Sequence, residues 1–166
     1  MESDREAFSA WAAASQHALL RTAVLLTGDH HRAEDLVQEA LTKVAQRWSR
    51  LRGEHPGAYA RQILVRDNIS WWRKHRRQSV VEAEPPPVPS ADPAVDRRIM
   101  LEQALGGLTP RQRSVVVLRY YDDLTVDQTA DVMKVSVGTV KSQTHLALRR
   151  LREGAPELAE LLEETP

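Results

Sequence analysis

The chain has 166 residues, and its 23 lysine and arginine residues balance 23 aspartate and glutamate residues, so the formal net charge is zero. This length allows one domain or two small ones, and the lack of cysteine excludes disulfides and thiolate metal sites. No apolar run approaches the ~20 residues that a membrane span needs, and the N-terminus lacks a charged-then-apolar export signal, so we expect a cytoplasmic protein.

Two amphipathic helices are predicted at the N-terminus. Ser3 and Glu6 form a capping-box pattern, and apolar residues at helical spacing continue from there to Leu26. Asp29 is placed to cap a second helix, from about His30 to Trp48, which has one apolar stripe. The opposite face of the second helix is polar and carries Asp35, Gln38, Glu39, Thr42 and Gln46. Such a face is either solvated or a docking surface, and the residues alone favour the solvated interpretation.

The sequence Asp29-His30-His31 matches a motif of a phosphoesterase family, which raises a metal-binding hypothesis. Adjacent residues on a helix point about 100° apart and do not share a face. No companion cluster of aspartate and histidine occurs elsewhere in the chain. We therefore interpret these residues as a helix N-cap and two surface histidines, and we predict no metal, no other cofactor and no catalytic site.

A third helix, from about Pro56 to Arg77, is predicted after a polar loop that covers Ser49 to Gly57. Adjacent tryptophans diverge by about 100° on a helix, so either Trp71 or Trp72 is expected in the core. Rings interleaved with cations and amides suit single-stranded DNA, because bases stack on the rings while cations follow the backbone. A purely structural role for the tryptophans fits the residues equally well. The candidate strand-binding residues are Arg61, Arg66, Asn68, Trp71, Trp72, Arg73 and Arg76.

Five prolines between Ala83 and Val95 predict an extended linker, which at about 13 residues reaches at most ~40 Å. A helix from Arg97 to Leu105, capped by Asp92 or Asp96, would then begin a second domain. The predicted division is an N-terminal domain at 3–82, a linker at 83–96, a C-terminal domain at 97–153 and an acidic tail at 154–166.

The segment from Leu108 to Arg152 predicts three helices, of which the last two form a helix-turn-helix. Capping boxes begin the first two helices at Thr109 and Thr125, and Ser136 caps the third. Only two residues separate the last two helices, which forces a sharp crossing between them. Three arginines of the first of these helices are expected to face water or phosphate: Arg111, Arg113 and Arg119.

The last helix of this motif has the side chains that a major-groove reader requires. Its N-terminal half is small or polar, with only Val140 pointing back to the core. Gln143 can pair bidentately with an adenine edge, and Lys141 suits a guanine or a phosphate. The candidate duplex-reading residues are Arg119, Thr139, Lys141, Ser142, Gln143, His145 and Arg149.

The runs LTPRQRSVVVLRYYDDLT, SVGTVKSQ and LRRLR resemble region 4 of the extracytoplasmic-function (ECF) sigma factors of the sigma-70 family, in particular the actinobacterial sigma-E branch. The resemblance implies a subunit of bacterial RNA polymerase that reads the −35 promoter element with this helix. Two positions depart from the family. Lys134 stands where glycine is usual, so we expect a non-glycine residue at positive φ, at a cost of about 1 kcal/mol. Leu146 stands where arginine is common, so a phosphate contact is lost and an apolar side chain is exposed.

The N-terminal half carries the same resemblance. The run AEDLVQEAL resembles region 2.2, which docks on the coiled coil of the polymerase β′ clamp, and this implies polymerase contacts by Asp35, Gln38 and Glu39. The run PGAYARQILVRDNISWWRKHRR resembles regions 2.3 and 2.4, which melt and hold the −10 element. The family often has asparagine where Arg66 stands. Asn68 is close but on a different face, so which of the two contacts the flipped base stays open.

We therefore expect an all-α protein with two small helical domains, sigma region 2 and sigma region 4, that acts as a sigma factor and not as an enzyme. Its expected partners are promoter DNA and core RNA polymerase, through the β′ clamp coiled coil and the β flap, and an anti-sigma factor is a further candidate. The alternative is a polymerase-independent helix-turn-helix regulator. Such regulators lack a basic-aromatic helix like 69–77 and usually dimerise on two-fold operators.

Overall fold

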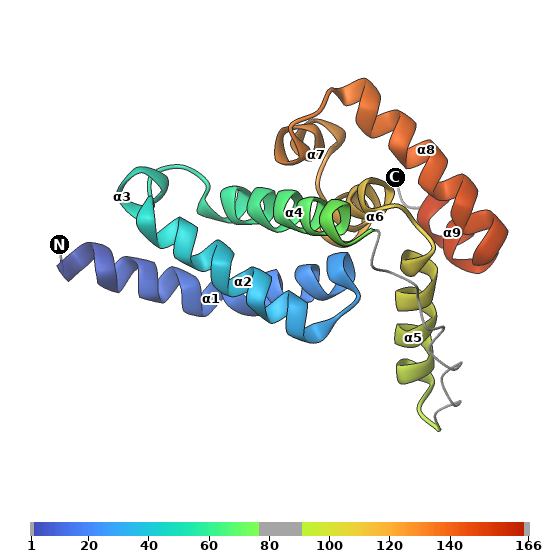
Figure 1. The fold of residues 1–166 in the computed structure, drawn as a ribbon, viewed down its shortest axis with the longest axis horizontal. Helices are drawn as coiled ribbons and strands as arrows, with labels where there is room; N and C mark the ends of the chain where they lie inside the picture. Colours follow the sequence, from blue (N-terminus) through green and yellow to red (C-terminus); the bar gives the residue numbers. More distant parts are fainter. Residues whose placement is uncertain (1, 77–90, 165–166) are drawn as a thin grey trace.

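The structure is a computed structural model that describes residues 2–76 and 91–164. Within these residues every regular element is a helix and no strand occurs, which confirms the all-α prediction (Figure 1). The elements in chain order are α1 (Glu2–Thr27), α2 (His30–Gln46), α3 (Trp48–Leu51), α4 (Pro56–His75), α5 (Pro93–Gly106), α6 (Pro110–Val116), the π-helical stretch η1 (Val117–Tyr121), α7 (Val126–Met133), α8 (Val137–Gly154) and α9 (Pro156–Glu163).

The N-terminal half is a bundle in which α1, α2 and α4 pack against one another (Figure 1). Asp29 caps α2 as predicted, because its Oδ1 accepts from the Arg32 amide at 3.0 Å. The prediction of Ser3 as the first cap was wrong, since α1 already begins at Glu2. The predicted loop at 49–57 was also partly wrong. Its first residues belong to α3, because Trp48 and Leu51 are buried, and Trp48 packs edge-on against Phe8 at 5.5 Å.

Helix α5 begins within the segment 83–96 that was predicted to be a linker. Asp92 caps α5 by accepting from the Ala94 amide at 2.9 Å, and Pro93 takes the first helical turn, where its missing N–H is not needed. Helix α5 therefore starts at Pro93 and not at Arg97. The remaining predicted linker residues, 83–90, and Arg77 at the end of the third predicted helix lie outside the described residues.

The helix-turn-helix of α7 and α8 forms as predicted. Both capping boxes are present, at Thr109 and at Thr125, and Ser136 accepts from the Thr139 amide at 3.1 Å. Lys134 has φ 56° in the left-handed region, and Leu146 is 41% exposed, so the expected positive φ and the expected exposed apolar side chain are both confirmed. In the tail, α9 packs on α8 and Ala159 is buried, whereas Leu161 is 65% exposed.

The two halves do not stand apart: α4 packs against α6 and α7, and α1 packs against α6 and η1. One continuous set of buried residues runs from Leu19 on α1 to Leu151 on α8. Arg113, predicted to face water or phosphate, is only 5% exposed, so that prediction was wrong. Its Nε donates to the carbonyl of Leu25 at 2.6 Å, which lies in the last turn of α1. A carbonyl at a helix end has no partner within its own helix, and here an arginine from the other half supplies one.

Candidate nucleic-acid and polymerase interface

The basic residues of α4 divide into exposed and occupied ones. Arg66, Arg73 and Arg76 are exposed, and Arg66 forms only a surface ion pair with the neighbouring Asp67, with Nε and Oδ1 3.3 Å apart. Arg61 is different: its side chain is 31% exposed, and its Nε lies 3.4 Å from a carboxylate oxygen of Asp122 in the other half. The candidate cations Arg66, Arg73 and Arg76 are therefore available to a polyanion, whereas Arg61 has an internal counter-charge.

Asn68 is buried, with 1% of its surface exposed. Its Nδ2 donates to the carbonyl of Leu26 at 3.0 Å, and its Oδ1 accepts from Nη2 of Arg32 at 2.8 Å. Both ends of the amide are used inside the protein, so Asn68 cannot read a base without breaking these bonds. The sequence did not decide whether Arg66 or Asn68 contacts the flipped base, and of these two only Arg66 is exposed to solvent.

Trp71 and Trp72 meet edge to face, with ring centroids 5.3 Å apart. The prediction that one of them enters the core was wrong, since both are half-buried. Trp71 is already stacked: the guanidinium carbon of Arg32 lies 3.3 Å from its ring centroid, and the His75 ring lies 4.0 Å away at 12°. The contacts of Trp72 are looser, with Arg32 at 5.5 Å. Trp72 is therefore the ring better able to accept a base.

Arg32 on α2 links α2 to Asn68 and Trp71 of α4, and the sequence patterns did not identify it. Its guanidinium bonds Asn68 and covers Trp71, and its partial burial lowers its pKa, an effect that Asp29 opposes. An arginine one turn into a helix, beside an acidic N-cap, is ordinarily interpreted as a surface residue. The signal that could have revealed it is the paired tryptophan on a neighbouring helix, since a guanidinium stacks readily on indole rings.

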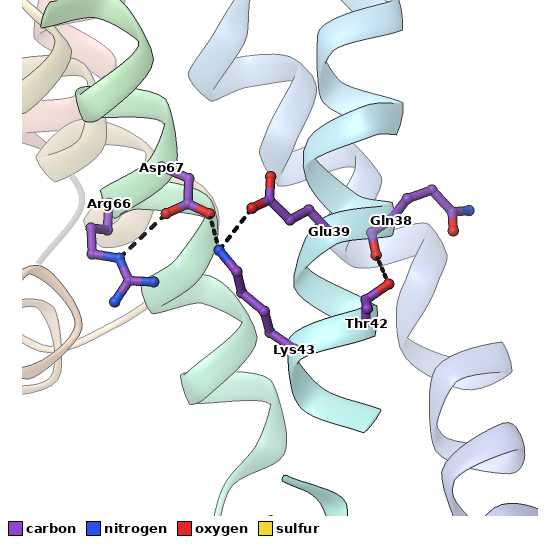
Figure 2. Close-up of polar contacts among 6 residues, drawn as sticks. All are labelled: Gln38, Glu39, Thr42, Lys43, Arg66 and Asp67. Atoms are coloured by element: carbon purple, nitrogen blue, oxygen red, sulfur yellow. Dashed lines mark hydrogen bonds and ion pairs between the residues drawn. The ribbon is translucent and has the colours of Figure 1, made fainter. Parts of the chain in front are cut away.

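The polar face of α2 is linked to α4 by an ion-pair chain, which Figure 2 shows. Nζ of Lys43 lies 2.8 Å from Oε1 of Glu39 and 2.7 Å from Oδ2 of Asp67. The hydrogen bonds to Asp67 and Glu39 raise the pKa of Lys43. The Gln38 side chain points away from this cluster, and the Thr42 hydroxyl donates to the backbone carbonyl of Gln38 at 2.8 Å (Figure 2). Asp35, Gln38 and Glu39 are all exposed, so the three candidate residues lie on one open face.

The recognition helix α8 is open to solvent along its predicted reading face. Lys141, Ser142, His145 and Arg149 are exposed, Thr139 and Gln143 are half-buried, and Val140 is fully buried as expected. Arg119 lies in η1 and is half-buried, and its Nε is a buried atom without a hydrogen-bond partner in the described part of the chain. Arg119 is therefore less available to DNA than the side chains of α8.

Comparison with known proteins accounts for both halves. The family model for sigma-70 region 2 matches residues 12–78, and that for sigma-70 region 4 matches residues 104–153. The RNA polymerase sigma-E factor of Streptomyces coelicolor is 37% identical over 149 residues, which cover 88% of this chain and 84% of that protein. The ECF sigma factor SigL of Mycobacterium tuberculosis is 33% identical over 84% of both chains. The chain belongs to the ECF sigma factors of the sigma-70 family.

A solved structure extends the similarity to the fold. The sigma factor RpoE of Bartonella quintana, in a complex with the anti-sigma factor NepR, aligns with a TM-score of 0.71 and 26% identity over 96% of this chain and 98% of that one. As an RNA polymerase sigma factor, the protein directs transcription initiation and is not an enzyme. Sigma factors bind core RNA polymerase and promoter DNA. Within the described residues of this sigma factor, no helix has the length and apolar character needed to cross a membrane.

Substituting Asn68 and Arg66 separately should distinguish a structural amide from an exposed cation. Asn68→Ala leaves the Leu26 carbonyl and the Arg32 guanidinium without their partner, so it should lower the free energy of unfolding by about 1–3 kcal/mol. Arg66→Ala removes only an exposed ion pair and should change it by less than about 1 kcal/mol. Urea unfolding of both variants measures this, and equal losses would contradict the assignment.

Proposed function

We propose that this sigma factor binds its partners through three separate surfaces. The polymerase surface is the exposed face of α2 with Asp35, Gln38 and Glu39. The strand surface is the exposed side of α4 with Arg66, Trp72, Arg73 and Arg76, joined by Arg61 when it is released from Asp122. The duplex surface is α8 with Thr139, Lys141, Ser142, Gln143, His145 and Arg149. The observation that carries the proposal is that these side chains are exposed or half-buried at the surface, while the apolar side chains of the same helices are buried in two clusters.

The α2 surface suits the β′ clamp coiled coil of polymerase. Two carboxylates flank a neutral amide on an exposed helical face, and the Gln38 side chain points away from the Lys43 ion pairs in Figure 2. A carboxylate can accept charge-assisted hydrogen bonds from basic residues, and an amide can bond without a charge partner. The ion pair with Lys43 favours one orientation of the Glu39 carboxylate towards polymerase.

The α4 surface suits the melted −10 strand, and α8 suits the −35 duplex. Exposed arginines beside the open ring of Trp72 combine backbone attraction with base stacking, which single strands require. On α8, polar side chains at the N-terminal half can reach base edges, and Arg149 further along would contact phosphate. The two units proposed to carry these surfaces are residues 3–82 and the segment from α5 to the end of α8.

Further partners follow from the same family. We infer that the C-terminal unit also contacts the polymerase β flap, and that an anti-sigma factor sequesters the protein when its promoters are silent. The match over almost the whole chain to a sigma factor held by an anti-sigma factor supports the second point. Core RNA polymerase is cytoplasmic, so we place the activity there.

The polymerase surface is tested by combining Gln38→Ala with Glu39→Ala. Both residues are exposed and lie opposite the buried stripe of α2, so the fold should remain intact while affinity for core polymerase falls. Pull-down with core polymerase, and transcription from the start sites that appear only when the sigma factor is added, give the readout. The exposed pair His30 and Glu34, replaced by alanine together, is the matched control. Unchanged polymerase affinity in the Gln38–Glu39 variant would remove this surface from the interface.

The strand surface is tested by Trp72→Ala. Stacking of a base on such a ring is worth about 1–3 kcal/mol, and duplex DNA offers no exposed base to stack. The variant should therefore retain binding to polymerase and to the −35 duplex but open the −10 region poorly. A template pre-melted over the −10 region should recover part of the loss. Permanganate reactivity of the −10 thymines is the measurement, and normal reactivity would assign Trp72 a packing role only.

A further inference from the structure

Leu146 is an exposed apolar side chain on the recognition helix α8, and none of the three surfaces proposed above includes it. It is 41% exposed. Within residues 2–76 and 91–164 it is the one exposed large apolar side chain on α8, the others being Val95, Met100, Tyr121 and Leu161. Single exposed apolar residues are common on protein surfaces, so exposure alone assigns no function to Leu146. Its position on the helix and the charge around it do.

Leu146 lies on the outward face of α8, among the proposed DNA contacts. Side chains three and four residues apart share one side of a helix, so Leu146 lies between Ser142 and Arg149, which are both exposed. The buried residues of the helix form a separate stripe, which consists of Val140, Ala147 and Leu151. Leu146 is therefore in the middle of the proposed duplex surface and not at the edge of the core.

The hydroxyl groups nearest to Leu146 along α8 are already engaged as donors. Oγ of Ser142 donates to the carbonyl of Thr139 at 3.0 Å, and Oγ1 of Thr144 donates to the carbonyl of Val140 at 2.7 Å. A hydroxyl has one proton, so neither can donate to a base while these bonds persist. The Leu146 side chain has no polar atom. The recognition that it can provide is contact with an apolar group.

The charge around Leu146 indicates which apolar group would meet it. Residues 137–152 of α8 include no acidic residue, and Lys141, Arg149 and Arg150 are exposed. A partner of this face must therefore present an apolar group beside negative charge. The major groove of DNA does so at thymine, because the C5 methyl group of thymine projects into a groove that lies between two phosphate backbones.

We propose that Leu146 reads a thymine of the −35 element by packing on its C5 methyl group. Gln143 and Leu146 are about 4.5 Å apart along the helix axis, and successive base pairs are about 3.4 Å apart along the duplex. The thymine should therefore lie about one base pair from the position that Gln143 contacts. This inference rests on the duplex-reading role proposed above for α8, and it adds an apolar contact to the polar ones.

The test removes the methyl group from the DNA and the leucine side chain from the protein. Uracil differs from thymine only in lacking the C5 methyl group. In a promoter whose start site requires this sigma factor, each thymine of the −35 element, on either strand, is replaced by uracil in turn. Leu146→Ala removes the proposed protein partner. Leu161→Ala, the same change at a 65% exposed position on α9, is the matched control.

The measurement is the affinity of polymerase holoenzyme for the labelled promoter duplex, by fluorescence anisotropy. At one −35 thymine, uracil should weaken binding by the starting holoenzyme about fourfold, which corresponds to one buried methyl group. The Leu161→Ala holoenzyme should show the same loss. Leu146→Ala should bind the thymine promoter at least about fourfold more weakly, and uracil should then cause no further loss, because both changes remove one contact. Circular dichroism establishes that each variant is folded.

Two results would overturn the role of Leu146. One is a uracil effect that is absent at every −35 thymine or is equal in the Leu146→Ala and Leu161→Ala holoenzymes. The other is weaker binding of Leu146→Ala to core polymerase without DNA, which would assign the side chain to a protein interface. Replacing the whole −35 element separates the two proposals. If that leaves the affinity unchanged, the duplex-reading role of α8 fails as well, whereas a loss with neutral uracil substitutions removes only Leu146.

Discussion

The C-terminal end of α1 is the point on which the arrangement of the whole molecule depends. The carbonyls of Leu25 and Leu26 have no partners within α1, and each accepts a side-chain donor from a distant element. Arg113 on α6 donates to Leu25, and Asn68 on α4 donates to Leu26. Burial lowers the pKa of Arg113 to about 10, so it remains charged at neutral pH. One helix end thus fixes α4 of its own half and α6 of the other.

The contact between Arg113 and the end of α1 also explains why the residue after α1 is glycine. Gly28 has φ 70°, in the left-handed region that side chains rarely adopt, and it ends α1 as its amide donates to Val24 at 2.8 Å. A Cβ at this position would lie 3.1 Å from Nη2 of Arg113. Glycine therefore meets two demands, the backbone conformation that reverses the chain and the close approach of a buried arginine. The side chains that we propose to contact DNA therefore stand on the helices α4 and α8 and not on loops.

The parts of the fold that were predictable follow local rules. The caps at Asp29, Thr109, Thr125 and Ser136 and the strained turn at Lys134 depend on residues within a few positions, and all five were anticipated. The errors concern contacts between distant segments. Arg113 donates to the carbonyl of Leu25, 88 positions away, and Asn68 donates to that of Leu26, 42 positions away. Both polar side chains are buried because each is the hydrogen-bond partner of a backbone carbonyl.

The candidate site also contains residues whose exposure follows from local periodicity and residues whose environment depends on distant segments. Helical periodicity predicted which faces of α2 and α8 point outward, because exposure there follows from the apolar stripe of the same helix. On α4 the periodicity was not sufficient. Arg32 from α2 stacks on Trp71 and bonds Asn68, and Asp122 from the C-terminal half pairs with Arg61. Three of the seven candidate strand contacts are therefore occupied by side chains from elsewhere. Such occupation depends on tertiary packing, which one helix's sequence does not encode.

The central claim is that the two halves of this sigma factor share one core when the protein is free. All four tryptophans, at positions 11, 48, 71 and 72, lie in the N-terminal half, so tryptophan fluorescence reports on that half alone. Far-ultraviolet circular dichroism reports on the helices of both halves. In a urea titration followed by both signals, a shared core predicts coincident single transitions with one midpoint. A fluorescence transition separated from the circular dichroism transition, or a circular dichroism curve with two steps, would show that the halves fold independently and contradict the account.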